Sequence, residues 1–413
     1  MAKILIISTF FPPRKHIASN RIESFAKYLS EFGHSITVIT KGERDACIIT
    51  DDIKIYYVKD NVLLRPLNTF RKDYTLVHIF KCIYNMLFLN VLVDEASAWT
   101  NKALKVARNI HKEEKFECIV SSALPIGPHI IAANLKKITP NIKLIMDMRD
   151  AVWSPSYPLF TRYRLIKLFR KLALQSDCIL SVSSKQMKKY ELILEDKVKC
   201  LEINNGYNFD LTLKKYRKNE VFTIAFAGTL HGAINTDNLF AALVNFADKN
   251  HNFKLRIIGT TKPIYVPQKI ADKISFEDYM PYDKLITILK EETDLLVLII
   301  PKSREEGIYS GKIFDYLGCL KPILGLVPRN DVAAQLIRDT KAGYIAENEN
   351  IDEIEQNILK AYLDWTNNIP FNPNLSLIRK FHRKEQAKIL DNLIVSLCRG
   401  NDSENCNDNT SMD

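Results

Sequence analysis

Residues 295–328 read LLVLIIPKSREEGIYSGKIFDYLGCLKPILGLVP. The stretch opens with an apolar run, LLVLII (295–300), whose length and composition are typical of a buried strand. A polar loop follows, residues 311–319 predict a helix, and a second apolar run, PILGLV (322–327), predicts the next strand. The order strand, helix, strand predicts a parallel sheet with crossover helices.

The same rhythm continues outward in both directions, because short β-rich runs alternate with helix-length amphipathic segments through most of the chain. Strands are predicted in the first half at 3–8, 35–40, 53–58, 118–122, 143–148, 178–183 and 199–203. Helices are predicted there at 18–32, about 76–113, 127–138, 161–176 and 184–194. In the second half, strands are predicted at 222–228, 255–259, 273–279, 295–300, 322–327 and 342–347. Helices are predicted there from 235 and at 282–292, 311–319, 331–340, 351–366 and 376–398.

A chain of 413 residues is too long for one ordinary domain, so two are expected. The predicted fold class is α/β, with two Rossmann-like doubly wound domains facing an interdomain cleft, where the carboxyl ends of the strands bind ligands. The NNGY sequence at 204–207 is interpreted as a turn with positive φ that could also act as a hinge. The predicted parts are an N-terminal domain 1–205, a linker 206–221, a C-terminal domain 222–370, a C-terminal helix 371–400 returning to the first domain, and a disordered tail 401–413.

The composition, 46% hydrophobic and 26% charged residues, indicates a globular protein. Its eight cysteines are scattered with no C-x-x-C pair, which favours reduced core residues over disulfides or a metal site. We expect no signal peptide, because the sequence starts with a predicted strand, and the longest apolar stretch, 82–93, is too short to span a bilayer. We therefore expect a cytoplasmic protein, either unattached or peripheral on the inner face of the cell membrane.

The net charge of +10 predicts an anionic partner. Nucleic acid is not expected, since no helix-turn-helix, RNP or zinc pattern is present. Basic residues gather at 65–81 and at 162–171, where they are interleaved with or adjoin apolar residues. That pattern fits an anionic membrane surface, and it fits equally a solvated helix face above ordinary core.

The polar loop of the opening stretch ends in Ser310, Gly311 and Lys312, where the helix begins. A helix N-terminus is a natural anion site, because backbone N–H groups and the helix dipole point to it. Gly311 lets the backbone approach a phosphate, Lys312 supplies charge, and Ser310 is expected to cap the helix and donate to an oxygen. Asp315 lies on a neighbouring face of the helix, from which a carboxylate can bind both hydroxyls of a ribose.

The second domain opens with FAGTLHG (226–232). Gly228 and Thr229 lie in a strand-to-helix turn whose amides can meet a diphosphate, although such glycines often only make the turn. No G-x-G-x-x-G follows the first strand of the chain, which argues against a nicotinamide or flavin enzyme. We expect no cofactor, and no Asp-x-Asp metal motif is found.

The loop after the first strand, FFPPRKHIASNR (10–21), is basic. Arg14 and His16 precede the predicted helix and Arg21 lies one turn into it. A loop between a strand end and a helix start favours contact with a phosphate or an acceptor. The alternative is a merely basic surface loop.

The segment KLIMDMRDAVWSP (143–155) delivers Asp147, Arg149 and Asp150 to the carboxyl end of a strand. Charge at such a place is costly unless it serves a ligand or a pair. Asp150 is our candidate for proton transfer or for holding a sugar hydroxyl, with Arg149 holding it or touching phosphate. A structural ion pair of Arg149 with Asp147 or Asp150 is the alternative.

The segment SGKIFDYLGCLKPILGLVP (310–328) resembles the nucleotide-sugar motif of family-4 glycosyltransferases, which have the GT-B fold. The start ILIISTFFPP, the segment MDMRDAVWSP and the turn FAGTLHG are similar to three further segments of that family, and the likeness spans about residues 1–365. Departures are Arg14-Lys15-His16 in place of two glycines, and Gly307 with Asp315 at the two positions of Glu-x7-Glu. A family His near the 147–150 strand end is absent, which leaves Asp150.

The resemblance implies a retaining, metal-independent transfer of a sugar from a nucleoside-diphosphate donor to a saccharide or polyprenyl-linked acceptor, in surface polysaccharide assembly. The N-terminal domain would hold the acceptor and the C-terminal domain the nucleotide sugar. Lys312, helped by Arg256 or Lys262, would stabilise the leaving diphosphate, and Asp150 would serve the acceptor. Two alternatives remain open: a nucleotide-sugar 2-epimerase, and a non-catalytic GT-B relative that acts as a binding protein.

Overall fold

The structure is a computed structural model that describes most of the chain in two compact units. Unit 1 comprises Met1–Asn204 and the segment that begins at Gln386, and unit 2 comprises Asn205–Glu385. The described residues are 1–14, 18–59, 83, 97–123, 126–151, 159–211, 218–230, 234, 236–249, 251–260, 265–302 and 307–399. The predictions that concern His16, Lys262, the basic segment 65–81 and the tail 401–413 lie outside them.

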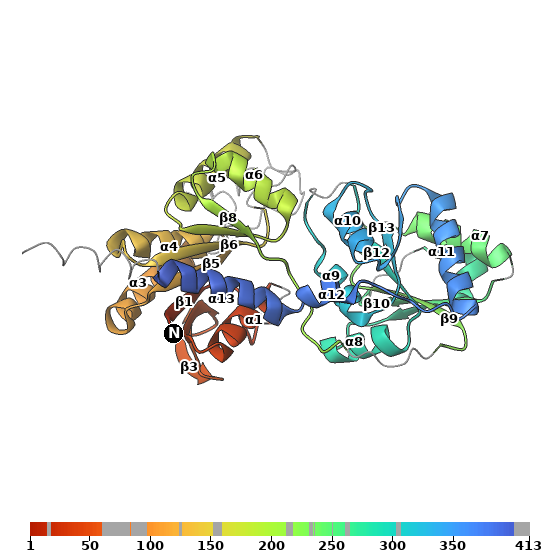
Figure 1. Cartoon of the computed structure of the whole chain (residues 1–413), viewed down its shortest axis with the longest axis horizontal. Coiled ribbons are helices and arrows are strands. Elements are labelled where there is room, and N and C mark those ends of the chain that lie inside the picture. Colours follow the sequence, from red (N-terminus) through yellow and green to blue (C-terminus); the bar gives the residue numbers. More distant parts are fainter. Residues whose placement is uncertain are drawn as a thin grey trace, which may run out of the picture. The chain divides into compact units, whose positions relative to one another are not determined.

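Unit 1 contains, in its described part, an eight-stranded sheet in the order β3-β4-β2-β1-β5-β6-β7-β8, in which only β3 runs antiparallel to its neighbour (Figure 1). The strands are β1 (Lys3–Ile7), β2 (Ser35–Gly42), β3 (Ala46–Thr50), β4 (Ile53–Lys59), β5 (Cys118–Ala123), β6 (Lys143–Met148), β7 (Cys178–Ser181) and β8 (Lys199–Glu202). In the register of β1, Lys3 lies opposite Ser35 of β2, and Ile4 lies opposite Cys118 of β5. The strand order reverses at β1, so the carboxyl ends of β1 and β5 flank the point at which doubly wound sheets bind ligands.

Helices cover both faces of this sheet. Successive residues of β1 point to opposite faces, so alternate residues of this strand pack against the two helix layers. The helices of unit 1 are α1 (Ser19–Glu31), α3 (Ser97–Glu114), α4 (Gly127–Ile138), α5 (Leu159–Ala173), α6 (Ser184–Leu194) and α13 (Arg383–Arg399), which enters the unit at Gln386. Ile4 and Ile6 pack in one core with α1 and α13. Leu5 and Ile7 pack in the other with α3, α4, α5 and α6.

Unit 2 has a sheet that is entirely parallel in its described residues, in the order β11-β10-β9-β12-β13-β14 (Figure 1). The strands are β9 (Phe222–Ala227), β10 (Phe253–Ile258), β11 (Ile274–Glu277), β12 (Leu295–Ile299), β13 (Ile323–Leu326) and β14 (Gly343–Ala346). The helices are α7 (Asp237–Asp248), the 3-10 helix η2 (Gln268–Lys273), α8 (Tyr282–Glu291), α9 (Gly311–Cys319), α10 (Val332–Asp339), α11 (Ile351–Thr366) and α12 (Leu375–Lys380). One core lies under α7 and α11, and the other under α8, α9, α10 and α12. The order reverses between β9 and β12.

The antiparallel strand β3 was not predicted. Its residues ACIIT are mostly exposed, with Ile49 72% accessible, so no alternation of buried and polar residues reveals it. Asp51 and Asp52 adopt positive φ and make the turn that folds β3 back onto β4.

The predicted linker and the last predicted helix both need correction. Tyr207 is fully buried in a core of unit 2, so the start of the 206–221 segment packs as part of that unit. Gly206 does not have positive φ; a Cβ there would lie 2.2 Å from the Phe381 carbonyl oxygen, so the glycine permits close approach. Tyr207 N donates to Phe381 O, and Arg383 N donates to Tyr207 O. This pairing interrupts the helix expected over 376–398, which is two helices, α12 and α13.

Candidate functional site

The switch point of unit 2 brings together Lys312 and Gly228, which are 84 positions apart in the numbering. Gly228 directly follows β9 and has φ +130°, and a Cβ at this position would lie 2.0 Å from the Lys312 Nζ atom. Lys312 follows Gly311 in the first turn of α9, and its Nζ atom lies 4.6 Å from the centroid of the Phe226 ring. The glycine is therefore required twice, once for its backbone angle and once for the approach of the ammonium group.

Tyr316 positions this lysine. It lies four residues after Lys312 and hence on the same face of α9. Its buried hydroxyl accepts a hydrogen bond of 3.0 Å from the Ala227 amide, at the end of β9. The bond anchors α9 to the strand that Lys312 reaches. Tyr316 is not among the site residues predicted from the sequence, although its spacing of four residues from Lys312 could have indicated it.

The turn after β9 is tied to the end of β10. Gly228 N donates to Ile258 O over 2.7 Å, and the Thr260 hydroxyl donates to the Gly228 carbonyl over 2.9 Å. The Thr229 hydroxyl donates to Gly259 O over 3.4 Å. Both predicted turn residues, Gly228 and Thr229, are thus held at the carboxyl edge of the sheet.

Ser310 occupies the N-cap position of α9 in an extended conformation, but its side chain makes no capping hydrogen bond. The expected cap through this hydroxyl is therefore wrong. The Ser310 carbonyl instead accepts from Ile313 N over 3.1 Å.

Asp315 turns toward α8 and not toward Gly228. The Tyr282 hydroxyl donates to its carboxylate over 2.6 Å. Burial raises the pKa of Asp315 to about 6, and the Tyr282 hydrogen bond and the charge of Arg383 oppose this rise. The pKa of this carboxyl group therefore lies closer to neutrality than that of an exposed aspartate.

Arg256, the expected helper, is occupied by carboxylates. Its guanidinium donates to both oxygens of Glu277, over 2.6 and 2.9 Å, and to Glu292 over 2.6 Å. These bonds join β10, β11 and the end of α8, which favours a structural role.

In unit 1, Arg21 and Asp147 form a buried ion pair, 6% and 0% exposed. Arg21 donates to both carboxylate oxygens, over 2.8 to 3.2 Å, and to the carbonyls of Ile203 and Asn204. Ser122 also donates to Asp147, over 2.8 Å. The Arg21 guanidinium group donates its hydrogen bonds within this network. The geometry therefore gives Arg21 a structural role in place of the anion contact expected from the sequence.

Arg149 and Asp150 lie beside this pair at the end of β6. Arg149 Nε donates to the Asp150 carboxylate over 3.1 Å, and Nη1 donates to the Ala18 carbonyl over 3.0 Å. Burial lowers the pKa of Arg149 from its usual value. The Asp150 side chain is 53% exposed, so it is the member of the pair that a ligand can reach.

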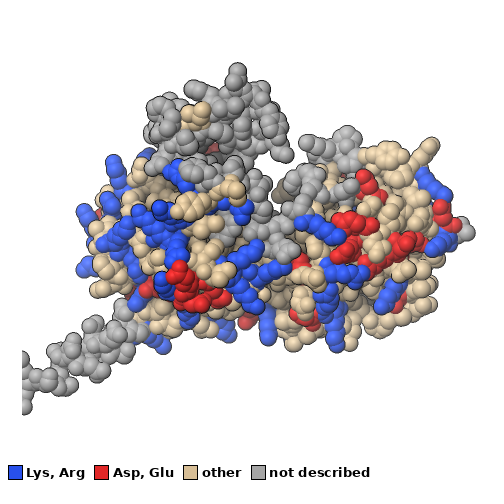
Figure 2. All heavy atoms as spheres, turned by 90° about the horizontal axis from the view of Figure 1, so that it is seen from above, with Lys and Arg blue, Asp and Glu red and all other residues tan. Residues whose placement is uncertain are grey.

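The ring of Phe10, on the loop after β1, lies close to two guanidinium groups. The Arg14 and Arg149 guanidinium carbons lie 4.8 and 5.3 Å from its ring centroid. The structure thus brings Arg14, Arg149 and Asp150 to one end of the unit 1 sheet. Figure 2 shows many Lys and Arg side chains over the described surface of unit 1, on the left of the view.

Within the described ranges, no group of three or more His, Cys, Asp or Glu side chains is arranged to hold a metal ion. The same residues include no helix long and apolar enough to cross a bilayer.

No protein-family model matches the sequence, and no curated protein matches it. Solved structures do match. Sucrose-phosphate synthase from Thermosynechococcus elongatus superposes with a TM-score of 0.65 at 11% identity, over 97% of this chain and 100% of that one. A glycosyltransferase from Rickettsia africae gives 0.64 at 16%, over 96% and 98%. The E. coli structure described as trehalose-6-phosphate bound with UDP-2-fluoro glucose gives 0.64 at 9%, over 96% and 99%.

These similarities extend over nearly the whole length of both chains, and at such low identity they establish the fold. The chain has the GT-B fold, with two doubly wound α/β units, as its sequence predicts. Membership of family 4 stays a prediction.

Proposed function

We propose that the protein is a glycosyltransferase that moves a sugar from a nucleoside-diphosphate donor to a saccharide or lipid-linked saccharide acceptor. The observation that supports this best is the approach of Lys312 Nζ to the backbone of Gly228 at the switch point of unit 2. An ammonium group, the N-terminus of α9 and the amides of a glycine turn converge there, and all three favour a diphosphate.

The chemistry follows from the charge that develops on the leaving group. Cleavage of the bond between the sugar and the diphosphate leaves positive charge on the sugar ring and negative charge on the diphosphate oxygens. In this proposal Lys312 stabilises that negative charge, and the amides of Gly311 and Thr229 donate to the same oxygens. The Asp315 carboxylate accepts from the ribose hydroxyls, and its bond with Tyr282 keeps it oriented.

On the acceptor side we assign Asp150 to the incoming hydroxyl and Arg149 to holding Asp150 in place. Retention of configuration, family-4 membership and a role in surface polysaccharide assembly follow from the sequence resemblance and belong to this proposal. One similar structure carries UDP-2-fluoro glucose, which makes UDP-glucose the first donor to test.

Lys312→Ala tests the donor assignment. We expect turnover of the nucleotide sugar to fall by about 10²–10³-fold, the usual effect of removing one stabilising group from a developing anion. Thermal stability should change little, since Lys312 is only partly buried. The measurement is release of nucleoside diphosphate from a panel of nucleotide sugars with a mixture of saccharide acceptors.

Lys302→Ala is the matched control, because this lysine is in the same unit and pairs with the surface residues Glu347 and Glu349. Near-normal turnover in Lys312→Ala would overturn the assignment. Conversion of the donor without any acceptor would indicate an epimerase, and donor binding without turnover would indicate a binding protein.

We further propose that α5 contacts an anionic membrane surface. Its exposed side combines apolar Leu159 and Tyr163, 79% and 65% accessible, with Lys167 and Lys171. Basic residues beside exposed apolar ones favour such a surface. The protein should sediment with phosphatidylglycerol vesicles at low salt and remain in solution with phosphatidylcholine vesicles. Equal behaviour of Lys167→Glu/Lys171→Glu and the unaltered protein would count against the idea.

A further inference from the structure

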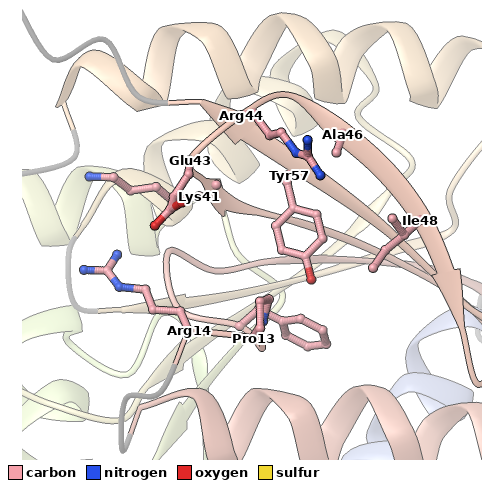
Figure 3. A pocket seen from close by; sticks show the side chains of 10 residues that line it. Pro13, Arg14, Lys41, Glu43, Arg44, Ala46, Ile48 and Tyr57 are labelled. Atoms are coloured by element: carbon pink, nitrogen blue, oxygen red, sulfur yellow. The ribbon is translucent and has the colours of Figure 1, made fainter.

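A hollow of about 830 Å³ opens in unit 1, and its lining includes neither Arg21 nor Asp147. It lies between the loop after β1, the end of β2 and the β3–β4 hairpin (Figure 3). Its lining residues are Phe11, Pro13, Arg14, Lys41, Gly42, Glu43, Arg44, Ala46, Ile48 and Tyr57. A volume of this size suits a small organic ligand such as a mono- or disaccharide.

The apolar part of the hollow is built around Tyr57. Its ring stands between the Arg44 side chain and Pro13 and Arg14 (Figure 3). Its hydroxyl donates to the Pro12 carbonyl over 2.6 Å, which fixes the ring against the β1 loop. A Cβ at Gly42 would lie 2.7 Å from the Tyr57 Cβ, so the glycine leaves room for the ring. A fixed aromatic face suits the apolar side of a sugar ring.

The charged part is strongly unbalanced. Among the described residues that line the hollow, Arg14, Lys41 and Arg44 are cationic and only Glu43 is acidic. Within the part of the chain that the structure describes, Arg14 and Arg44 form no ion pair. The neighbouring acid Asp45 is engaged by the Lys102 ammonium over 2.6 Å and by the Lys59 amide over 2.8 Å, so it does not neutralise the hollow.

The place of these cations in the sheet is also informative. Arg14 follows the carboxyl end of β1, and Arg44 follows the carboxyl end of β2. The two strands are hydrogen-bonded to each other in parallel. Ligands of doubly wound sheets bind at this end of the strands. Cations gathered in a concave wall raise the local concentration of anions.

We infer that this hollow binds the acceptor, and that the acceptor is an anionic saccharide. Its sugar ring packs on Tyr57, and its phosphate or carboxylate group lies against Arg14, Lys41 and Arg44. The role of the bound sugar as the acceptor rests on the proposed function, whereas the binding of an anionic sugar in the hollow does not.

The test is direct binding of small probes by calorimetry at low salt. Glucose 6-phosphate or glucuronate should bind at least about tenfold more tightly than glucose, the worth of one charge-assisted hydrogen bond. A preference between the first two identifies the anion as phosphate or carboxylate. Equal binding of glucose and both anionic sugars would overturn the inference, and so would inorganic phosphate binding as tightly as glucose 6-phosphate.

Arg44→Ala and Arg14→Ala should each weaken binding of the preferred anionic probe by about tenfold or more. Lys3→Ala is the matched control, since it removes a charge at the opposite end of β1 and should bind normally. Tyr57→Leu should weaken the sugar probes and leave inorganic phosphate unaffected. Normal binding of the anionic sugars by both arginine variants would overturn the site.

The same samples are titrated with UDP-glucose. If the arginine variants no longer bind the anionic sugars but still bind the donor and transfer its sugar normally, the hollow is not the acceptor site and the proposed function stands. Binding of anionic sugars by a protein that turns over no nucleotide sugar leaves the pocket in place and removes the proposed function.

Discussion

Each unit has a cation close to the place where the strand order of its sheet reverses, but the two cations are fixed in different ways. In unit 1, Arg21 is held by the carboxylate of Asp147 and by two backbone carbonyls, and it is almost fully buried. In unit 2, the Lys312 ammonium group occupies space that a side chain at position 228 would fill, and it lies near the ring of Phe226. Breaking the first arrangement should cost mainly stability, and breaking the second should cost mainly function.

Arg21→Ala should have the largest effect on folding. It leaves the Asp147 carboxylate buried without its cation, which costs about 3–5 kcal/mol. The midpoint of urea-induced unfolding measures this loss. Arg44→Ala, at an exposed position of the same unit, should change stability by no more than about 0.5 kcal/mol. An Arg21→Ala protein of normal stability that failed to bind an anionic sugar would reverse the assignment.

Gly228→Ala should cost less stability but more function. The new Cβ displaces the Lys312 ammonium, and φ +130° strains a residue other than glycine by about 1–3 kcal/mol. We expect UDP-glucose binding, measured by calorimetry, to be lost. Gly33→Ala is the control for backbone strain alone, because Gly33 also has positive φ but has open space where the new Cβ would lie. If Gly228→Ala bound the donor normally, Lys312 would have no role at this turn.

The smallest expected effect is a pH dependence of donor binding. Burial raises the pKa of Asp315 to about 6, and only the ionised carboxylate can accept from both ribose hydroxyls. UDP-glucose, whose diphosphate diester stays ionised, should therefore bind more weakly as the pH falls through about 6.

Tyr282→Phe sharpens this prediction. It removes the hydrogen bond that lowers the pKa of Asp315, so the midpoint of the pH dependence should move to higher pH. Asp315→Asn should abolish the dependence. A pH profile that is the same in all three proteins would exclude ribose binding by Asp315.

Local sequence patterns predicted much of the fold. The bounds of α4, α6, α9 and α11 agree with the prediction, because the spacing of their apolar residues marks one buried face in each helix. The edge strand β3 was missed because neither of its faces is buried. The break between α12 and α13 was missed because it depends on Tyr207, far away in the chain.

The candidate site was predictable to a similar degree. The sequence identified Lys312 and Gly228 separately, since each lies at a strand-to-helix turn. It did not show that one reaches the other, nor that Tyr316 anchors the helix between them. It also offered Arg21 and Arg256 as anion ligands, although both are occupied by carboxylates in the folded chain.

The sequence by itself determined the alternation of strands and helices, the division into two α/β parts and the loops that carry charge, because periodicity and turn chemistry act over a few residues. Only the tertiary structure decided which charges neutralise one another and which line a concave wall. Arg21 and Asp147 are 126 positions apart, and nothing in their spacing couples them. Arg14, Lys41 and Arg44 became one surface because β1 and β2 pair in parallel and bring their carboxyl ends to the same edge.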